Sequence, residues 1–125
     1  MTGPLVALGG GLGAATRFLL DSWVARHNRT GFPLGTIVIN VTGSFLLGLL
    51  TGWVLAGGVA GPLAAAAGVG FLGGYTTFST ATVEAVRLHR TGRHRVAVLH
   101  AGGMLVIAIV AATVGLWIAQ LGWGR

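Results

Sequence analysis

The chain has very little charge and no cysteine. Only 8% of its 125 residues are charged, and the two acidic residues are Asp21 and Glu84. A soluble domain carries about a quarter charged residues, so this composition does not fit a monomer in water. The absence of cysteine excludes disulfides and thiolate metal sites. Proline is scarce as well, with three residues, and the 23 glycines follow no three-residue period, which excludes a collagen-like chain.

Long apolar runs fill the sequence instead, and apolar residues make up 54% of it. A membrane-crossing helix needs about 20 mainly apolar residues. Abundant glycine fits such helices, because small residues let their backbones approach closely. No basic stretch precedes the first run, so we expect no signal peptide. We predict an all-α integral membrane protein with a single domain over residues 1–125 and four transmembrane helices, at about 4–24, 34–56, 62–86 and 96–121.

Arginine is concentrated in two of the three links between these stretches. Arg26 and Arg29 lie in the first link, and the range 87–95 of the third link holds four more arginines. The second link and the two ends of the chain carry only Arg125. By the positive-inside rule, this bias of six to one predicts that both basic links lie in the cytoplasm. Both termini then lie on the extracytoplasmic side of the cell (inner) membrane. The same pattern accounts for the net charge of +6 without nucleic acid as a partner.

Polar residues recur every four positions in the second stretch, at Thr36, Asn40 and Ser44. This spacing places them on one face of a helix. Such residues commonly form hydrogen bonds between membrane helices, and they can also line a polar path. Asn40 is the most demanding of the three, because its amide has two donor hydrogens and an acceptor to satisfy. The spacing alone leaves both interpretations open.

The third stretch contains the run Gly73-Gly74-Tyr75-Thr76-Thr77-Phe78-Ser79-Thr80. Paired glycines followed by β-branched threonines weaken a helix, so we predict a break from Gly73 to Thr76 near the bilayer midplane. A break at that depth must be buried in protein or line a polar cavity, and its freed carbonyls can coordinate a small hard cation. The alternative is an unbroken glycine-rich packing face whose hydroxyls bond to their own helix.

Ionisable residues inside the stretches are few. Arg17 lies deep in the first and Glu84 lies one turn beyond the threonine-rich run, so an ion pair between them is one interpretation. Asp21 is close enough to the end of its stretch to reach water. No catalytic triad, carboxylate pair or phosphate-binding loop is present, and we predict no enzymatic activity. We expect three histidines to be interfacial: His89, His94 and His100.

Three motifs resemble those of the CrcB/Fluc family of small fluoride channels, in order and over nearly the whole chain. They are Gly9-Gly10-Gly11-Leu12-Gly13-Ala14-Ala15-Thr16-Arg17, then Gly35-Thr36-Ile37-Val38-Ile39-Asn40-Val41-Thr42-Gly43-Ser44-Phe45, and the run from Gly73 to Thr80. The last of these is very specific.

The resemblance implies a passive fluoride-selective channel that exports fluoride and lowers its toxicity, built as an antiparallel, dual-topology-type dimer. It also implies a structural sodium ion, not transported, bound by the backbone carbonyls of Gly73 and Thr76. By position, Asn40 corresponds to the pore asparagine of the family and Phe78 to the first phenylalanine of its aromatic pair. Together with the polar stripe and the hydroxyl donors, the predicted fluoride path comprises Thr36, Asn40, Ser44, Phe78, Ser79 and Thr80, with Arg17 and Glu84 as structural residues.

The sequence departs from the family pattern in two ways. Ala81 stands where a second phenylalanine is usual, and our alignment places His100 and Met104 where a tyrosine and a serine are usual. A chain that forms antiparallel homodimers must insert both ways, whereas the arginine bias here fixes one orientation. We therefore expect a heterodimer with an oppositely oriented homologue, rather than a homodimer.

Two other functions fit four short membrane helices. A proton-coupled small multidrug exporter needs a membrane-embedded carboxylate, but neither Asp21 nor Glu84 is central in the first stretch. A non-conducting assembly subunit would show no flux even beside a homologous partner.

Overall fold

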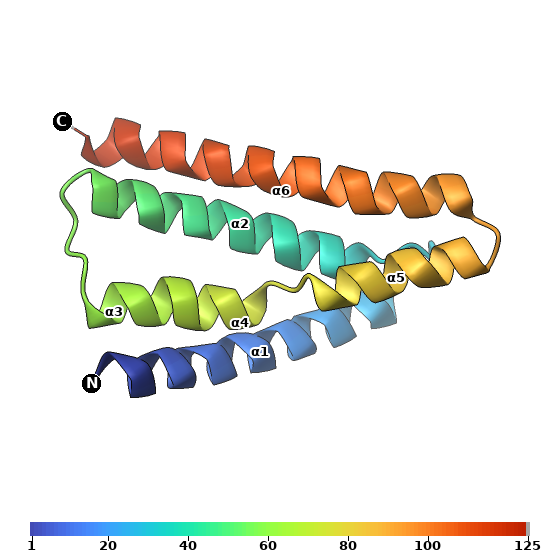
Figure 1. The fold of residues 1–125 in the computed structure, drawn as a ribbon, viewed down its shortest axis with the longest axis horizontal. Helices are drawn as coiled ribbons and strands as arrows, with labels where there is room; N and C mark the ends of the chain where they lie inside the picture. The colour runs from blue at the N-terminus through green and yellow to red at the C-terminus, as the bar shows by residue number, and fades with distance from the viewer. Residues whose placement is uncertain (125) are drawn as a thin grey trace.

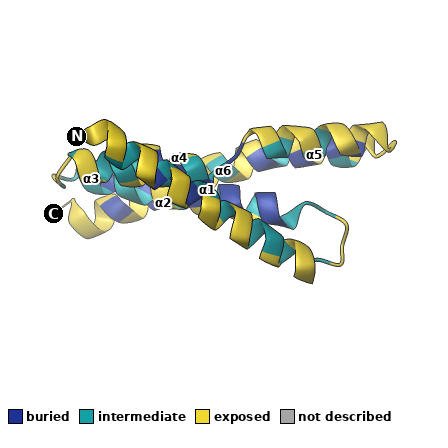
Figure 2. Cartoon of the chain, turned by 90° about the horizontal axis from the view of Figure 1, so that it is seen from below, coloured by how far each residue is buried: buried dark blue, intermediate teal, exposed yellow. Residues whose placement is uncertain are grey.

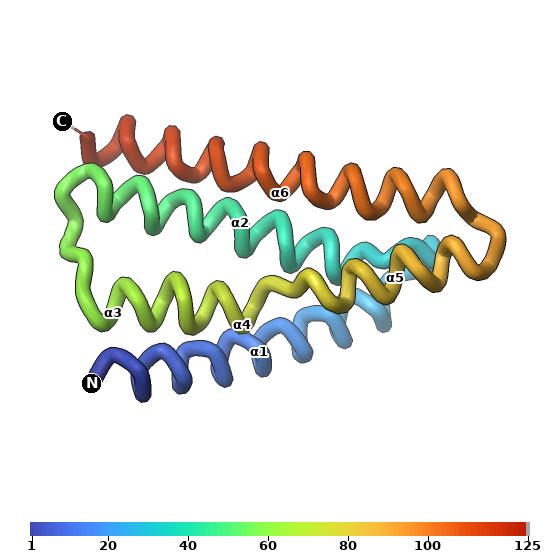
Figure 3. Tube along the Cα trace, viewed as in Figure 1, coloured from blue at the N-terminus to red at the C-terminus, as the bar shows by residue number. Residues whose placement is uncertain are grey.

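The computed structural model describes residues 1–124, and these residues contain helices and no strands. Three helices are long, and four helical segments between the second and third of them are short (Figures 1 and 3). The long helices are α1 (Thr2–His27), α2 (Leu34–Leu55) and α6 (His94–Trp123). The short segments are α3 (Pro62–Ala65), the π-helix η1 (Ala66–Leu72), α4 (Gly73–Tyr75) and α5 (Ser79–Arg90).

Three of the four predicted spans are present as helices long and apolar enough to cross a membrane: α1, α2 and α6, with 26, 22 and 30 residues. The residues of the predicted span 62–86 lie in α3, η1, α4 and most of α5, and none of these pieces is long enough to cross a membrane by itself. Large apolar side chains remain exposed along the long helices, among them Leu12, Phe18 and Val106. Figure 2 shows exposed residues along much of α1 and α5 and near the end of α6. This surface fits lipid rather than water, and the chain is a multi-pass membrane protein.

The broken third stretch changes its packing partner along its length. Its first half, in η1 and α4, packs against α1, whereas α5 packs against α6, and α2 packs mainly against α6 (Figure 1). An unbroken helix could not follow α1 and then cross to α6, so the break is what joins the two helix pairs.

Glycine allows α1 to lie directly against the third stretch. A methyl group added at Gly74 would collide with the backbone carbonyl of Gly10, and one added at Gly13 would collide with the carbonyl of Phe71. Small residues at both positions are the usual way in which membrane helices pack without a hydrophobic driving force. This contact holds the first half of the third stretch in place, directly before the break.

The two ends of the molecule differ in charge. The start of α1 and the end of α6 lie at one end, and the α1–α2 and α5–α6 turns lie at the other (Figure 1). The charged end therefore carries Arg26 and Arg29 together with the arginines of 87–95.

Candidate functional site

The helix break lies at Thr76–Phe78, so it begins three residues and ends two residues later than the predicted break and shares Thr76 with it. Gly73 and Gly74 are helical, in α4, and the backbone becomes extended only at Thr76, with φ −75° and ψ 157°. The predicted break from Gly73 to Thr76 was therefore correct in kind and wrong in position. Gly74 stays helical because its place against Gly10 requires a residue without a side chain, not a change of backbone direction.

Asn40 of α2 holds the break open. Its Nδ2 donates to the carbonyl of Thr77 at 2.8 Å, and its Oδ1 accepts from the Thr77 N–H at 2.8 Å. Both residues are buried, each 8% exposed. In a continuous helix the Thr77 N–H would donate to the carbonyl of Gly73. The amide thus replaces helical hydrogen bonds, and it keeps one further donor hydrogen.

A cluster of hydroxyl groups follows the break. The Thr77 hydroxyl donates to Thr80 Oγ1 at 3.1 Å and lies 3.3 Å from Ser79 Oγ. The Thr80 N–H donates to Thr77 Oγ1 at 3.2 Å, which satisfies one of the free N–H groups at the start of α5. The carbonyl of Thr76 therefore loses the helical donor that Thr80 would have supplied.

A small polar cavity of about 180 Å³ lies where α1, α2, the break and α5 meet. Arg17 is half-buried there, together with Asp21, which also contacts Gly35. Within residues 1–124, the carboxylate of Glu84 pairs with His100. The Arg17–Glu84 ion pair considered from the sequence is absent. The cavity is lined by Arg17, Phe18, Asp21, Thr36, Ile39, Thr77 and Thr80.

Glu84 instead binds Thr36 and His100. The Thr36 hydroxyl donates to Glu84 Oε1 at 2.8 Å, and His100 Nε2 lies 3.4 Å from Glu84 Oε2. The rings of His100 and Phe32 are perpendicular, with centroids 5.6 Å apart. His100 is only 2% exposed, so its ring lies inside the chain, which the expectation of an interfacial histidine did not include. Its position at the start of a span did not reveal this, but its alignment with a family tyrosine was a signal of an inward-facing position.

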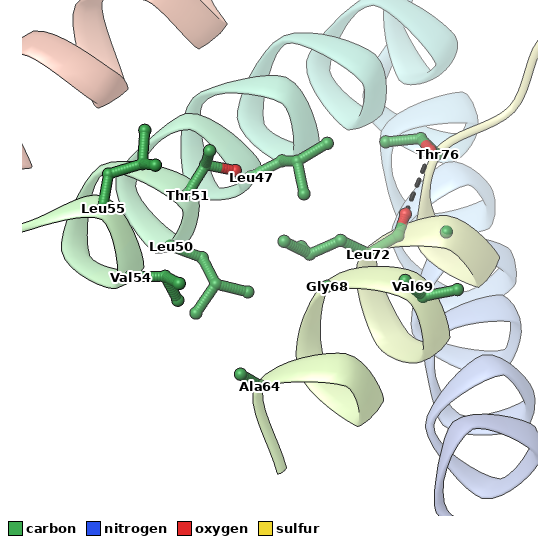
Figure 4. A pocket seen from close by; sticks show the side chains of 11 residues that line it. Leu47, Leu50, Thr51, Val54, Leu55, Ala64, Gly68, Val69, Leu72 and Thr76 are labelled. Atoms are coloured by element: carbon green, nitrogen blue, oxygen red, sulfur yellow. Dashed lines mark hydrogen bonds between the residues drawn. The ribbon is translucent and has the colours of Figure 1, made fainter. Parts of the chain in front are cut away.

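An apolar groove of about 520 Å³ separates α2 from the first half of the third stretch (Figure 4). Gly73 and Thr76, the predicted sodium-binding residues, line one end of it. The Thr76 hydroxyl donates to the carbonyl of Leu72 at 2.9 Å. A hydroxyl bonded to its own helix in this way was expected from the alternative interpretation, an unbroken glycine-rich packing face. The other lining residues are mostly aliphatic: Leu47, Leu50, Thr51, Val54, Leu55, Ala64, Gly68, Val69 and Leu72.

The structure brings some predicted site residues together and leaves others apart. Thr36 and Asn40 meet the break and α5, and their bonds are interhelical, as the packing interpretation of the stripe requires. Ser44 is half-buried and forms no side-chain hydrogen bond among the described residues. Phe78 is 86% exposed, and Ser79 beside it is exposed as well.

Comparison with known proteins identifies the family. A family model described as CrcB-like protein, Camphor Resistance, matches residues 4–116. Fluoride-specific ion channel FluC 1 of Leifsonia xyli is 50% identical over 93% of this chain and 85% of its own. FluC 2 of Cutibacterium acnes is 49% identical over 93% of this chain and 95% of its own. FluC 1 of Symbiobacterium thermophilum is 40% identical over the full length of both.

These relatives are named as ion channels rather than enzymes, and they confirm the resemblance carried by the three motifs. The chain belongs to the CrcB-like protein family.

Proposed function

We propose that the chain is a subunit of a passive fluoride-selective channel that exports fluoride from the cytoplasm. The observation that carries this proposal is the helix break at Thr76–Phe78, held open by Asn40 beside a polar cavity. Its relatives are named fluoride-specific ion channels. No energy source is required, because a negative interior drives an anion outward by about 2.3 kcal/mol per 100 mV.

The residues around the break suit a small anion that holds its water tightly. The second donor hydrogen of Asn40 and the hydroxyls of Ser79 and Thr80 offer fixed donors in place of water. Aromatic ring edges carry partial positive charge, and Phe78 presents an exposed ring next to these donors. Thr36 and Ser44 extend the path along α2 on either side of Asn40.

A structural sodium ion fits the carbonyls of Gly73 and Thr76. The N–H groups that would bind these carbonyls in a helix are used elsewhere, by Asn40 and by Thr77 Oγ1 respectively. Hard cations prefer oxygen ligands, and both residues line the end of one groove. A bound cation there would add a favourable field for an anion nearby.

A second, antiparallel subunit accounts for the groove and for the exposure of Phe78. The groove is apolar, and within the described residues no helix of the chain covers it. A symmetry-related copy or a homologue would bury it and would bring Phe78 into a shared path. The stretch 62–90 then serves as the fourth membrane crossing, because it runs beside the three long helices from end to end (Figure 1).

We favour a heterodimer over a homodimer. Ala81 provides no second aromatic ring, and His100 and Met104 replace the usual polar pair in the fourth span. Six arginines at the charged end of the molecule fix one orientation, with both termini extracytoplasmic. An oppositely oriented homologue would supply the missing ring and hydroxyl.

Expression in fluoride-sensitive cells that lack their own channel tests these points. We expect little protection from the chain alone and strong protection when a homologue with the opposite charge bias is present. Full protection by the chain alone would refute the heterodimer, and no protection with any homologous partner would refute the channel. Proton-driven efflux of a cationic dye would favour the multidrug exporter, whereas assembly without flux would favour the non-conducting subunit.

A further inference from the structure

Glu84 and His100 form a buried acid–base pair that the proposed fluoride path does not explain. The side chain of His100 is fully buried and that of Glu84 is 20% exposed. Thr36 satisfies Glu84 Oε1, but Glu84 Oε2 and both ring nitrogens of His100 lack hydrogen-bond partners within the described residues. A histidine buried in this way with an unsatisfied carboxylate oxygen 3.4 Å away is placed to exchange a proton with it.

Burial makes the number of protons on this pair important. An uncompensated carboxylate is costly to bury, and histidine is the side chain that changes charge most readily between pH 5 and 8. One proton shared between Nε2 and Oε2 makes the pair neutral overall. Without that proton the imidazole is neutral and the carboxylate leaves one negative charge in place.

The other charged groups near the pair come from α1 and from α5 itself. Arg17 and Asp21 of α1 line the same cavity as Thr36, which binds Glu84. Arg87 lies one turn along α5 from Glu84 and is exposed. On the α6 side, His100 is the titratable group that faces Glu84. The unpaired nitrogens of His100 thus make it the nearest proton acceptor.

We propose that Glu84 and His100 bind one proton between them and that this proton sets the charge of the anion path. The proposal rests on the proposed function, since Thr36 and Thr80 belong to the predicted path. Glu84 lies one helical turn from Thr80, a separation of about 6 Å between Cβ atoms. A unit charge about 6 Å away changes local anion occupancy by about threefold to a hundredfold, depending on the effective dielectric constant. Fluoride flux therefore falls as pH rises and the proton is lost.

Fluoride efflux from vesicles containing the assembled channel tests this at pH 5.5 and 8.0, with leakage from protein-free vesicles subtracted. We expect the unmodified channel to be about tenfold faster at the lower pH. His100→Gln removes one partner of the pair, so the pH profile of the unmodified channel is lost or displaced. Glu84→Gln removes the negative charge, so its flux at pH 8.0 approaches the acid value of the unmodified channel.

Two further variants serve as controls. His89→Gln removes an exposed histidine and keeps the pH profile, and Asp21→Asn keeps it with a displaced midpoint. A pH dependence of fluoride flux that His100→Gln leaves unchanged would overturn the proposal. If Asp21→Asn abolished that dependence at the same time, the proton site would lie at Asp21 instead.

Nuclear magnetic resonance of histidine-labelled chain in lipid nanodiscs separates this proposal from the proposed function. The His100 ring signals, assigned by their loss in His100→Gln, should change with pH and should change differently in Glu84→Gln. A ring that keeps one protonation state throughout would overturn the proposal. Absence of fluoride flux at every pH would instead contradict the proposed function. The resonance measurement on His100 would still show whether the pair binds a proton.

Discussion

Asn40→Ala tests the hydrogen bonds that hold the helix break. The substitution removes two bonds of 2.8 Å and leaves the buried N–H and carbonyl of Thr77 without partners. An unsatisfied buried polar group costs about 1–3 kcal/mol. The two together therefore predict a loss of about 2–6 kcal/mol in the free energy of unfolding, with reduced fluoride flux because the break loses its geometry.

Unfolding in mixed micelles, followed by the fluorescence of the four tryptophans, measures this loss. Ser44→Ala is the matched control, because Ser44 lies one turn further along α2 and forms no side-chain hydrogen bond within residues 1–124. We expect its unfolding free energy to stay within about 0.5 kcal/mol of the unmodified chain. An Asn40→Ala variant as stable as this control would refute the role of the amide in holding the break.

Three further predictions follow from the packing and from the site. Gly74→Val should sharply lower the yield of folded protein in size-exclusion chromatography, because its side chain collides with Gly10, whereas Gly11→Val, whose side chain enters open space, should not. Phe78→Ala should lower fluoride flux, and equal flux would remove the ring from the path. The unfolding free energy of the separate subunit should stay within about 0.5 kcal/mol, because the ring is 86% exposed in the single chain. Replacing sodium with a large organic cation should lower flux in vesicles if the Gly73 and Thr76 carbonyls hold the ion, and an unchanged rate would contradict that site.

The sequence predicted the helical membrane architecture and the break, because these depend on local composition. Apolar runs of about 20 residues define α1, α2 and α6 directly, and paired glycines with threonines mark the third stretch as weak. The position of the break depends on Asn40, which lies 37 residues away from Thr77 in the sequence. Only the packing of α2 against the break determines that the helical hydrogen bond from the Thr77 N–H to the Gly73 carbonyl is the one that is replaced.

The sequence predicted only part of the candidate site, because the rest depends on contacts between residues far apart in the chain. Thr36, Asn40 and Thr80 were singled out because polar residues are rare in membrane helices, and the structure brings them close to the break. The partner of Glu84 was not predicted: Arg17 was considered from charge alone, whereas the crossing of α5 over α6 places His100 against it. The π-helical turn Ala66–Leu72 has no local sequence signal that we can identify.

Selective fluoride flux is the most direct test of the whole account. The tagged chain, isolated from native membranes with any subunit that accompanies it, is reconstituted into vesicles loaded with fluoride or chloride, and efflux is started with a potassium ionophore. The account predicts rapid fluoride efflux, negligible chloride efflux and no requirement for a proton gradient. Equal passage of both anions, or fluoride efflux only when a proton gradient is imposed, would contradict it.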